Sequence, residues 1–190
     1  MGKFFDNLGA VLVAGFVLAI AIMVLPDAGY RPPTGDVLNG VLQWSHVFFG
    51  ITWIGLLYYF NFVQIPTMPS VPAELKPGVT KHIAPVALFY FRWGALFTVI
   101  SGAALAWSYG FLHQALMLDS SVRLIGIGMW LALIMAFNVW FLIWPNQKKA
   151  LGLVEADDAT KAKAARTAMV FSRANTMLSI PMLLAMTNAH

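Results

Sequence analysis

The sequence predicts an all-α protein: an integral membrane bundle of five transmembrane helices, formed by residues 1–190 as a single domain. Its 190 residues are 59% hydrophobic and only 11% charged, whereas a soluble domain carries about 25% charged residues. The apolar residues fall in long blocks, and about twenty apolar residues in a helix span the roughly 30 Å of a bilayer core. None of the blocks has the polar alternation of a barrel strand, so we interpret them as helices.

The predicted spans lie at about residues 8–25, 41–63, 83–107, 124–144 and 169–187. Lys3 precedes the first block as in a signal peptide, but we expect this block to be retained as a span. Only residues 146–166 form a long polar stretch. Asp157 or Asp158 is predicted to cap a helical extension there that runs into the fifth span.

Basic residues in the loops predict the orientation. One side collects eight of them: Lys3, Lys76, Lys81, Lys148, Lys149, Lys161, Lys163 and Arg166. The opposite loops hold only Arg31 and Arg123. By the positive-inside rule the N-terminus is cytoplasmic and the C-terminus periplasmic, in a multi-pass protein of the bacterial inner membrane. The net charge of +4 therefore indicates topology and a lipid environment, and we expect no nucleic-acid partner.

Cysteine is absent from the sequence. Disulfides, thiolate catalysis, thiolate metal sites and a covalently attached haem are thereby excluded for this chain.

One histidine stands inside a predicted span. His46 lies about one turn inside the apolar run 43–66, and an ionisable group in a membrane helix is a functional-site hypothesis because its burial is costly. His46, Gly50 and Trp53 are spaced i, i+4 and i+7 and share one helical face, where Gly50 leaves room for a flat ligand or a second helix. Two interpretations stay open: an axial ligand to haem b, or a neutral histidine hydrogen-bonded to a neighbouring helix.

A second axial ligand is expected from the same side of the membrane. His190 follows the fifth span at a depth similar to that of His46, so the predicted metal ligands are His46 and His190. His113 lies in an outer loop and is expected to be a surface residue. His82 lies at the cytoplasmic edge, most of a bilayer thickness from His46, so the two cannot share one iron.

Two arginines and two asparagines are predicted to bind an anion. Arg92 lies well inside the third span and needs an anionic partner, a polar cavity or a route to the interface. Arg173, Asn138 and Asn175 belong to the same cytoplasmic half. Two guanidinium groups favour a carboxylate or a urate-like ring as the bound anion.

Four blocks resemble the membrane domain of the bacterial cytochrome c-linked urate oxidase (urate hydroxylase) family: WSHVFFGITWIGLLYYF, FRWGALFTVISGAALAW, NVWFLIWPNQKKAL and SRANTMLSIPMLLAMTNAH. The resemblance implies an inner-membrane helical protein linked to purine oxidation or a related redox reaction, with family histidines at His46 and His190. Ala174 stands where a histidine is expected, and Gly94 where an acidic residue is expected. The family protein also has more spans and an attached cytochrome c domain. A weaker likeness is to small membrane haem proteins of the protoporphyrinogen oxidase type.

The resulting functional hypothesis is a haem b-binding redox protein, with possible urate oxidase-like oxidoreductase activity, that passes electrons to a separate c-type cytochrome. A second hypothesis is a non-catalytic subunit that docks on a larger respiratory or transport complex through its small-residue and aromatic faces. A third is a small transporter or channel with Arg92 on its polar path. Self-association into a homo-oligomer is left open.

Overall fold

The computed structural model describes residues 2–25, 31 and 36–189. Within these residues all regular structure is helical and no strand occurs, which confirms the predicted all-α class. The chain divides into two compact units, residues 1–41 and 42–190, which are described separately below. The single domain predicted over the whole chain stays a prediction.

The first unit contains a short helix α1 (Gly2–Phe5) and the apolar helix α2 (Leu8–Val24). Asn7 caps α2, because its side-chain oxygen accepts a hydrogen bond from the backbone N–H of Ala10 at 3.1 Å. Helix α2 matches the predicted block 8–25, and none of its residues is buried by other described parts of the chain. At 17 residues it is shorter than each of the continuous helical segments Val37–Ser70, Lys76–Ser108, Arg123–Ala150 and Asp158–Asn188.

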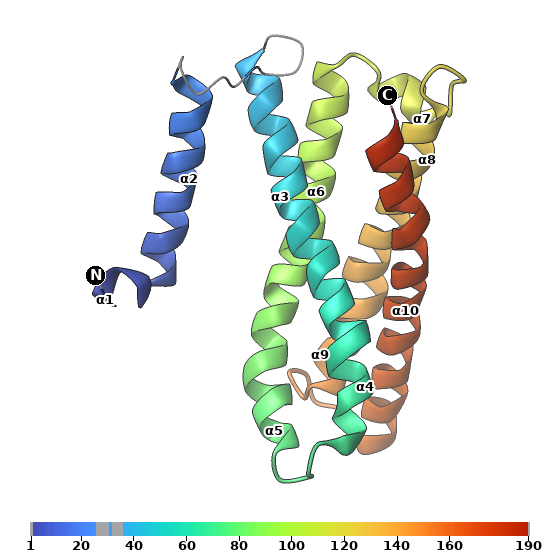
Figure 1. The fold of residues 1–190 in the computed structure, drawn as a ribbon. Helices are drawn as coiled ribbons and strands as arrows, with labels where there is room; N and C mark the ends of the chain where they lie inside the picture. Colours follow the sequence, from blue (N-terminus) through green and yellow to red (C-terminus); the bar gives the residue numbers. More distant parts are fainter. Residues whose placement is uncertain (1, 26–30, 32–35, 190) are drawn as a thin grey trace. The chain divides into compact units, whose positions relative to one another are not determined.

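Four long helical segments form the second unit (Figure 1). The first runs through α3 (Val37–Tyr58), which begins in the first unit, then η3 (Tyr59–Gln64), α4 (Ile65–Thr67) and η4 (Met68–Ser70). The second comprises α5 (Lys76–Gly78), η5 (Val79–Ile83) and α6 (Ala84–Ser108). A short helix α7 (Leu112–Leu116) leads to the third segment, made of α8 (Arg123–Phe137), η6 (Asn138–Ile143) and α9 (Trp144–Ala150). Helix α10 (Asp158–Asn188) is the fourth.

All four segments are long and apolar enough to cross a membrane, and α2 is a shorter apolar helix. The helical segments extend beyond the predicted apolar spans, since they are Val37–Ser70, Lys76–Ser108, Arg123–Ala150 and Asp158–Asn188. Which part of each segment lies within a membrane stays a prediction. Hydropathy marks only the apolar part of a helix, whereas hydrogen bonding continues through polar turns. The predicted cap at the start of the last helix is confirmed at Asp157.

Three helical segments widen locally into π-turns (η3, η5 and η6). Each π-turn ends two residues before a proline: Pro66, Pro85 and Pro145. Proline has no N–H and its ring would meet the carbonyl four residues earlier. In each case the residue before the proline donates its N–H five residues back, as Ile65 does to Phe60. The wider turn accommodates the proline without ending the helix.

Segment α3–η3 crosses the bundle, so that its two halves have different neighbours (Figure 1). Trp53 of α3 packs on Gly94 of α6, whereas Asn61 of η3 contacts Ser172 of α10. The fully buried large side chains lie between these helices: Trp53, Leu57, Phe91, Met135, Val139 and Ile143.

The connections of the second unit gather at two ends. Segments α4, α5 and α9 and the start of α10 lie at one end, and α7 lies at the other (Figure 1). The first end carries most of the basic residues of the unit: Lys76, Lys81, Lys148, Lys149, Lys161, Lys163 and Arg166. This distribution agrees with the charge pattern from which the orientation was predicted.

Candidate functional site

His46 is held between α3 and α6. Its Nδ1 lies 2.9 Å from the carbonyl oxygen of Thr98. A backbone carbonyl can only accept, so Nδ1 carries the proton and, in the neutral ring, the lone pair lies on Nε2. No described residue forms a hydrogen bond with that nitrogen. The ring is half-buried and therefore has one engaged nitrogen and one free acceptor.

A glycine of α6 makes room for this ring. A Cβ built on Gly102 would lie 2.7 Å from His46 Cε1 and 2.8 Å from Nδ1, closer than any real Cβ contact. Any larger residue at position 102 would displace the imidazole from the Thr98 carbonyl. No spacing rule in the sequence connects this glycine with His46, which lies 56 residues earlier.

The predicted shared face of His46, Gly50 and Trp53 is the face that packs on α6. A Cβ on Gly50 would meet only Thr98 Cγ2, at 3.9 Å, and a Cβ on Gly94 would lie 3.3 Å from the backbone nitrogen of Trp53. A second helix therefore packs against this face, closely at Trp53 and more loosely at Gly50. The Trp53 indole is fully buried, and its N–H has no partner among the described residues.

The structure describes two of the three other histidines. His190, the predicted second metal ligand, lies outside the described residues. His113 lies on α7 and His82 on η5, and both are exposed. Among described residues, no three His, Asp or Glu side chains gather as a metal-binding group would. A haem needs only one or two such ligands, so this finding does not bear on haem.

Arg92 is partnered by aromatic rings. Its guanidinium carbon lies 3.8 Å from the centre of the Trp144 ring and 5.5 Å from that of Phe89, and Nη1 donates to the Leu88 carbonyl at 3.2 Å. A guanidinium stacks well on an indole, which lowers the cost of its position within the helix. The remaining N–H donors are available to an anion.

Asn138 and Asn175 bond to each other between η6 and α10. Asn138 Nδ2 donates to Asn175 Oδ1 at 2.8 Å, and Asn175 Nδ2 donates to the Met135 carbonyl at 2.9 Å. Both residues are buried. These amide donors already have protein acceptors, which is the arrangement of a helix-joining pair. Their predicted role in binding an anion stays a prediction.

Polar side chains that the sequence analysis did not connect join the end of α3 and η3 to α10. Asn61 Nδ2 donates to Ser172 Oγ at 2.8 Å, and the Tyr58 hydroxyl lies 3.0 Å from Ser179 Oγ. The available signal was the spacing of Ser172, Thr176 and Ser179, which places three hydroxyl groups along one side of an apolar helix. Arg173 is exposed beside them and lines a groove with Asn61 that does not include Arg92.

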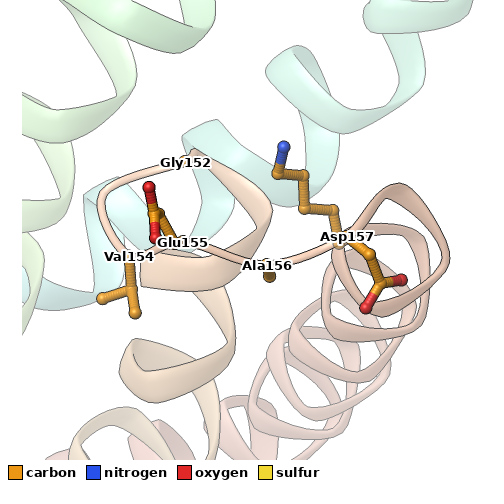
Figure 2. Close-up of a pocket in the computed structure, with 6 residues that line it drawn as sticks. Gly152, Val154, Glu155, Ala156 and Asp157 are labelled. Carbon is orange, nitrogen blue, oxygen red and sulfur yellow. The ribbon is translucent and has the colours of Figure 1, made fainter.

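A larger, open hollow lies at the basic end, in the loop before α10 (Figure 2). It measures about 590 Å³ and is lined by Gly152, Val154, Glu155, Ala156, Asp157 and Lys161. The carboxylates of Glu155 and Asp157 point in different directions and do not converge (Figure 2). The hollow therefore has no focused charge with which to hold a ligand.

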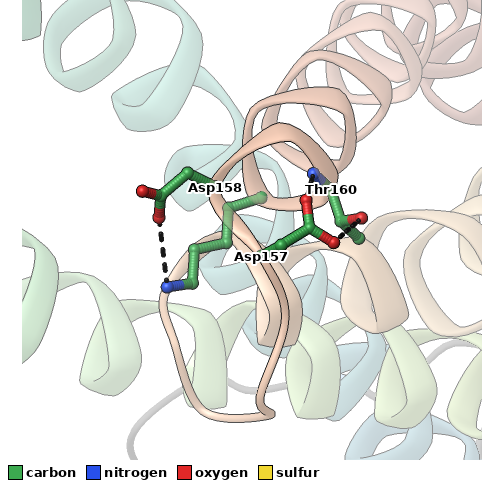
Figure 3. Close-up of polar contacts among 4 residues, drawn as sticks. Asp157, Asp158 and Thr160 are labelled. Carbon is green, nitrogen blue, oxygen red and sulfur yellow. Dashed lines mark hydrogen bonds and ion pairs between the residues drawn. The ribbon is translucent and has the colours of Figure 1, made fainter.

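Asp157 is instead the N-cap residue of α10. Its Oδ1 accepts from the Thr160 backbone N–H at 2.8 Å and its Oδ2 from the Thr160 hydroxyl at 2.7 Å (Figure 3). These hydrogen bonds hold the pKa of the exposed Asp157 carboxyl below its usual value. The next residue, Asp158, forms a surface ion pair with Lys161 at 3.6 Å. Both interactions are those of a helix N-terminus.

The fold and these contacts define a class: an α-helical protein in which the described part of the chain holds four helices long and apolar enough to cross a membrane, joined by polar pairs. Comparison with protein families then relates part of the chain to a known group. Residues 123–190, which run from α8 through α10, match the family described as urate oxidase N-terminal. Two of the four blocks noted in the sequence lie in this matched part. No curated protein and no solved structure matches the chain significantly.

Proposed function

We propose that this protein is a haem b-binding redox protein of the bacterial inner membrane, related to the membrane domain of urate oxidase, that passes electrons to a separate c-type cytochrome. The single observation that carries the proposal is the setting of His46. Its Nδ1 is engaged by the Thr98 carbonyl, and Nε2 has no partner among the described residues. Histidines that ligate metals are commonly oriented in this way, with the second nitrogen bonded to a backbone carbonyl.

The residues present fit haem ligation at one position. His46 would ligate through Nε2, the Thr98 carbonyl would fix the ring and its tautomer, and the absence of a side chain on Gly102 would let the ring lie in place. Bound haem supplies one-electron redox chemistry, which the polypeptide itself lacks. The protein's part is to orient the ligand and to exclude water with the surrounding apolar side chains.

Two further roles belong to the proposal. His190 is the proposed second ligand, as the resemblance to the family implies. Arg92 is the proposed contact for an anionic substrate, because its guanidinium is held by Trp144 while some of its N–H donors have no partner among described residues. The family match over residues 123–190 supports the relation to urate oxidase but does not include His46.

The decisive experiment is an optical spectrum of the purified full chain, oxidised and reduced, with a pyridine haemochrome assay. We expect a Soret band that is lost in His46→Gln, because an amide cannot replace the imidazole nitrogen as an iron ligand. His113→Gln and His82→Gln are matched controls and should keep the band, since both residues are exposed at other sites.

A protein prepared with haem available that shows no Soret band would remove the proposal. So would an unchanged spectrum in His46→Gln. A melting curve for each variant separates loss of the cofactor from loss of the fold, because His46 also joins α3 to α6.

A further inference from the structure

A groove runs along the surface of the bundle between η3 and α10. We call it the Arg173 groove; it has a volume of about 400 Å³ and is lined by Asn61, Phe62, Arg173, Thr176, Met177 and Ile180. Phe62, Met177 and Ile180 are more than half exposed, so they present an apolar wall outward from the bundle. In a bilayer such a wall faces lipid chains.

Arg173 brings an unneutralised positive charge into this apolar setting. Its side chain is exposed and forms no hydrogen bond or ion pair with any described residue. Residues 37–70 contain no Asp or Glu, and the one acidic residue of α10 is Asp158 at its N-terminus, which pairs with Lys161. It lies fifteen residues before Arg173, so it is too far along the helix to neutralise the guanidinium. A guanidinium within a membrane helix is costly without an anionic partner. Among the described residues, the groove therefore contains no anion that could neutralise this charge.

Asn61 contributes a hydrogen-bond acceptor to the same groove that has no donor among the described residues. Its Nδ2 donates to the Leu57 carbonyl at 2.9 Å and to Ser172 Oγ at 2.8 Å. Its Oδ1 is buried and accepts no hydrogen bond from any described residue. A buried acceptor without a donor is unfavourable, so a ligand that carries a hydroxyl group would complete this amide.

Arg173 lies at the depth expected for a lipid headgroup. It follows Arg166, which belongs to the basic end of the bundle, by seven residues, and at 1.5 Å per residue this places it about 10 Å further along the helix axis. A long arginine side chain extends toward the interface from such a depth.

We propose that the Arg173 groove binds an anionic phospholipid whose headgroup carries a hydroxyl, such as phosphatidylglycerol. The phosphate accepts hydrogen bonds from Arg173, the headgroup hydroxyl donates to Asn61 Oδ1, and an acyl chain follows Phe62, Met177 and Ile180. A lipid is favoured over a soluble anion because the groove opens along the apolar outer face of the helices. This inference does not depend on haem.

Native mass spectrometry of the full chain in detergent tests the proposal with three lipids of matched acyl chains. Phosphatidylglycerol offers phosphate and hydroxyl, phosphatidylmethanol offers the phosphate alone, and phosphatidylcholine offers no net negative charge. We expect the wild-type chain to bind them in that order, with each step reducing affinity several-fold to about tenfold.

Variants separate the two halves of the site. Arg173→Gln should weaken both anionic lipids about tenfold, whereas Arg166→Gln, which removes a cation outside the groove, should change neither appreciably. Asn61→Leu should abolish only the preference for phosphatidylglycerol over phosphatidylmethanol. If Asn61→Leu does not fold, the comparison of these two lipids on the wild-type chain still tests the hydroxyl contact.

Equal binding of phosphatidylglycerol and phosphatidylcholine would overturn the proposal. An equal loss in Arg166→Gln and Arg173→Gln would also overturn it, by indicating general charge attraction. Binding of inorganic phosphate or urate at Arg173 without any preference among the lipids would assign the groove to a soluble anion instead. Each readout is independent of the Soret band that tests the proposed function.

Discussion

His46 and Arg92 are both polar side chains within apolar helices, but their partners differ in kind. His46 uses a backbone carbonyl of the neighbouring helix, and Arg92 stacks on the Trp144 ring. The first arrangement fixes a tautomer and leaves a lone pair, which suits a metal ligand. The second leaves N–H donors available, which suits an anion. The chemistry open to each residue thus follows from its immediate contacts.

The buried amide pair is the clearest residue-scale test of stability. We expect Asn175→Leu to lower the free energy of unfolding by about 1–3 kcal/mol, because the buried Asn138 Nδ2 loses its acceptor. The double variant Asn138→Leu with Asn175→Leu should cost less than the sum of the two single changes, since no orphaned amide remains.

Reversible unfolding in mixed detergent measures these differences. Asn188→Leu is the control, because its amide is exposed at the end of α10. Simple additivity of the two buried substitutions would contradict the interpretation of the pair as a coupled helix contact.

At the scale of elements, the long helical segments extend beyond the apolar runs in the sequence, and local features explain the extension. The π-turns before Pro66, Pro85 and Pro145 let three segments continue past a residue that normally ends a helix. Helix α10 begins at Asp158, well before the apolar block at 169–187, because Asp157 caps it and the intervening residues are good helix formers.

The cap of α10 predicts a pH dependence. Hydrogen bonds from Thr160 favour the charged form of Asp157 and lower its pKa in the folded protein. The group therefore contributes stability that is present above the unfolded pKa, about 3.9, and that is lost as the pH falls through the lower folded pKa. Relative to Asp157→Asn, we expect the wild-type melting temperature to be constant from about pH 5 to 7 and to fall below about pH 4.

Asparagine is a suitable comparison because it also caps helices but does not titrate in this range. Melting curves of the two proteins at matched ionic strength provide the test. A difference that is independent of pH down to about pH 3 would indicate that the charge of Asp157 does not stabilise the helix.

On the scale of the whole molecule, the charge distribution predicts orientation. The loop before α10 lies at the basic end of the second unit, and the loop after α7 lies at the other (Figure 1). Since the chain has no cysteine, single cysteines can report topology without background. We expect Ser120→Cys to react with a membrane-impermeant maleimide in spheroplasts, and Val154→Cys to react only after permeabilisation.

Both positions are exposed, so accessibility within the protein does not separate them. Denatured samples give the maximum labelling of each variant. The reverse pattern would place the N-terminal ends of α5 and α10 outside the cell and contradict the positive-inside assignment.

The helices themselves could be predicted from sequence because the determinants are local: the length of an apolar run, the placement of prolines, and an aspartate before a Lys/Ala segment. The shared face of His46, Gly50 and Trp53 was likewise implied by helical spacing. The histidine's partner was not, because Thr98 lies 52 residues away and no spacing rule connects them.

The sequence by itself therefore determined which segments are helical and which are apolar enough to cross a membrane. It also identified the polar side chains whose placement within those apolar helices is energetically unfavourable. Tertiary structure alone decided which partner each of these side chains has: the Thr98 carbonyl for His46, the Trp144 ring for Arg92, and Asn138 for Asn175. It also left Arg173 and the Asn61 carbonyl without partners among the described residues. The physical reason is that hydropathy and capping act within a few residues, whereas a buried polar atom is satisfied only by the helix that packs against it.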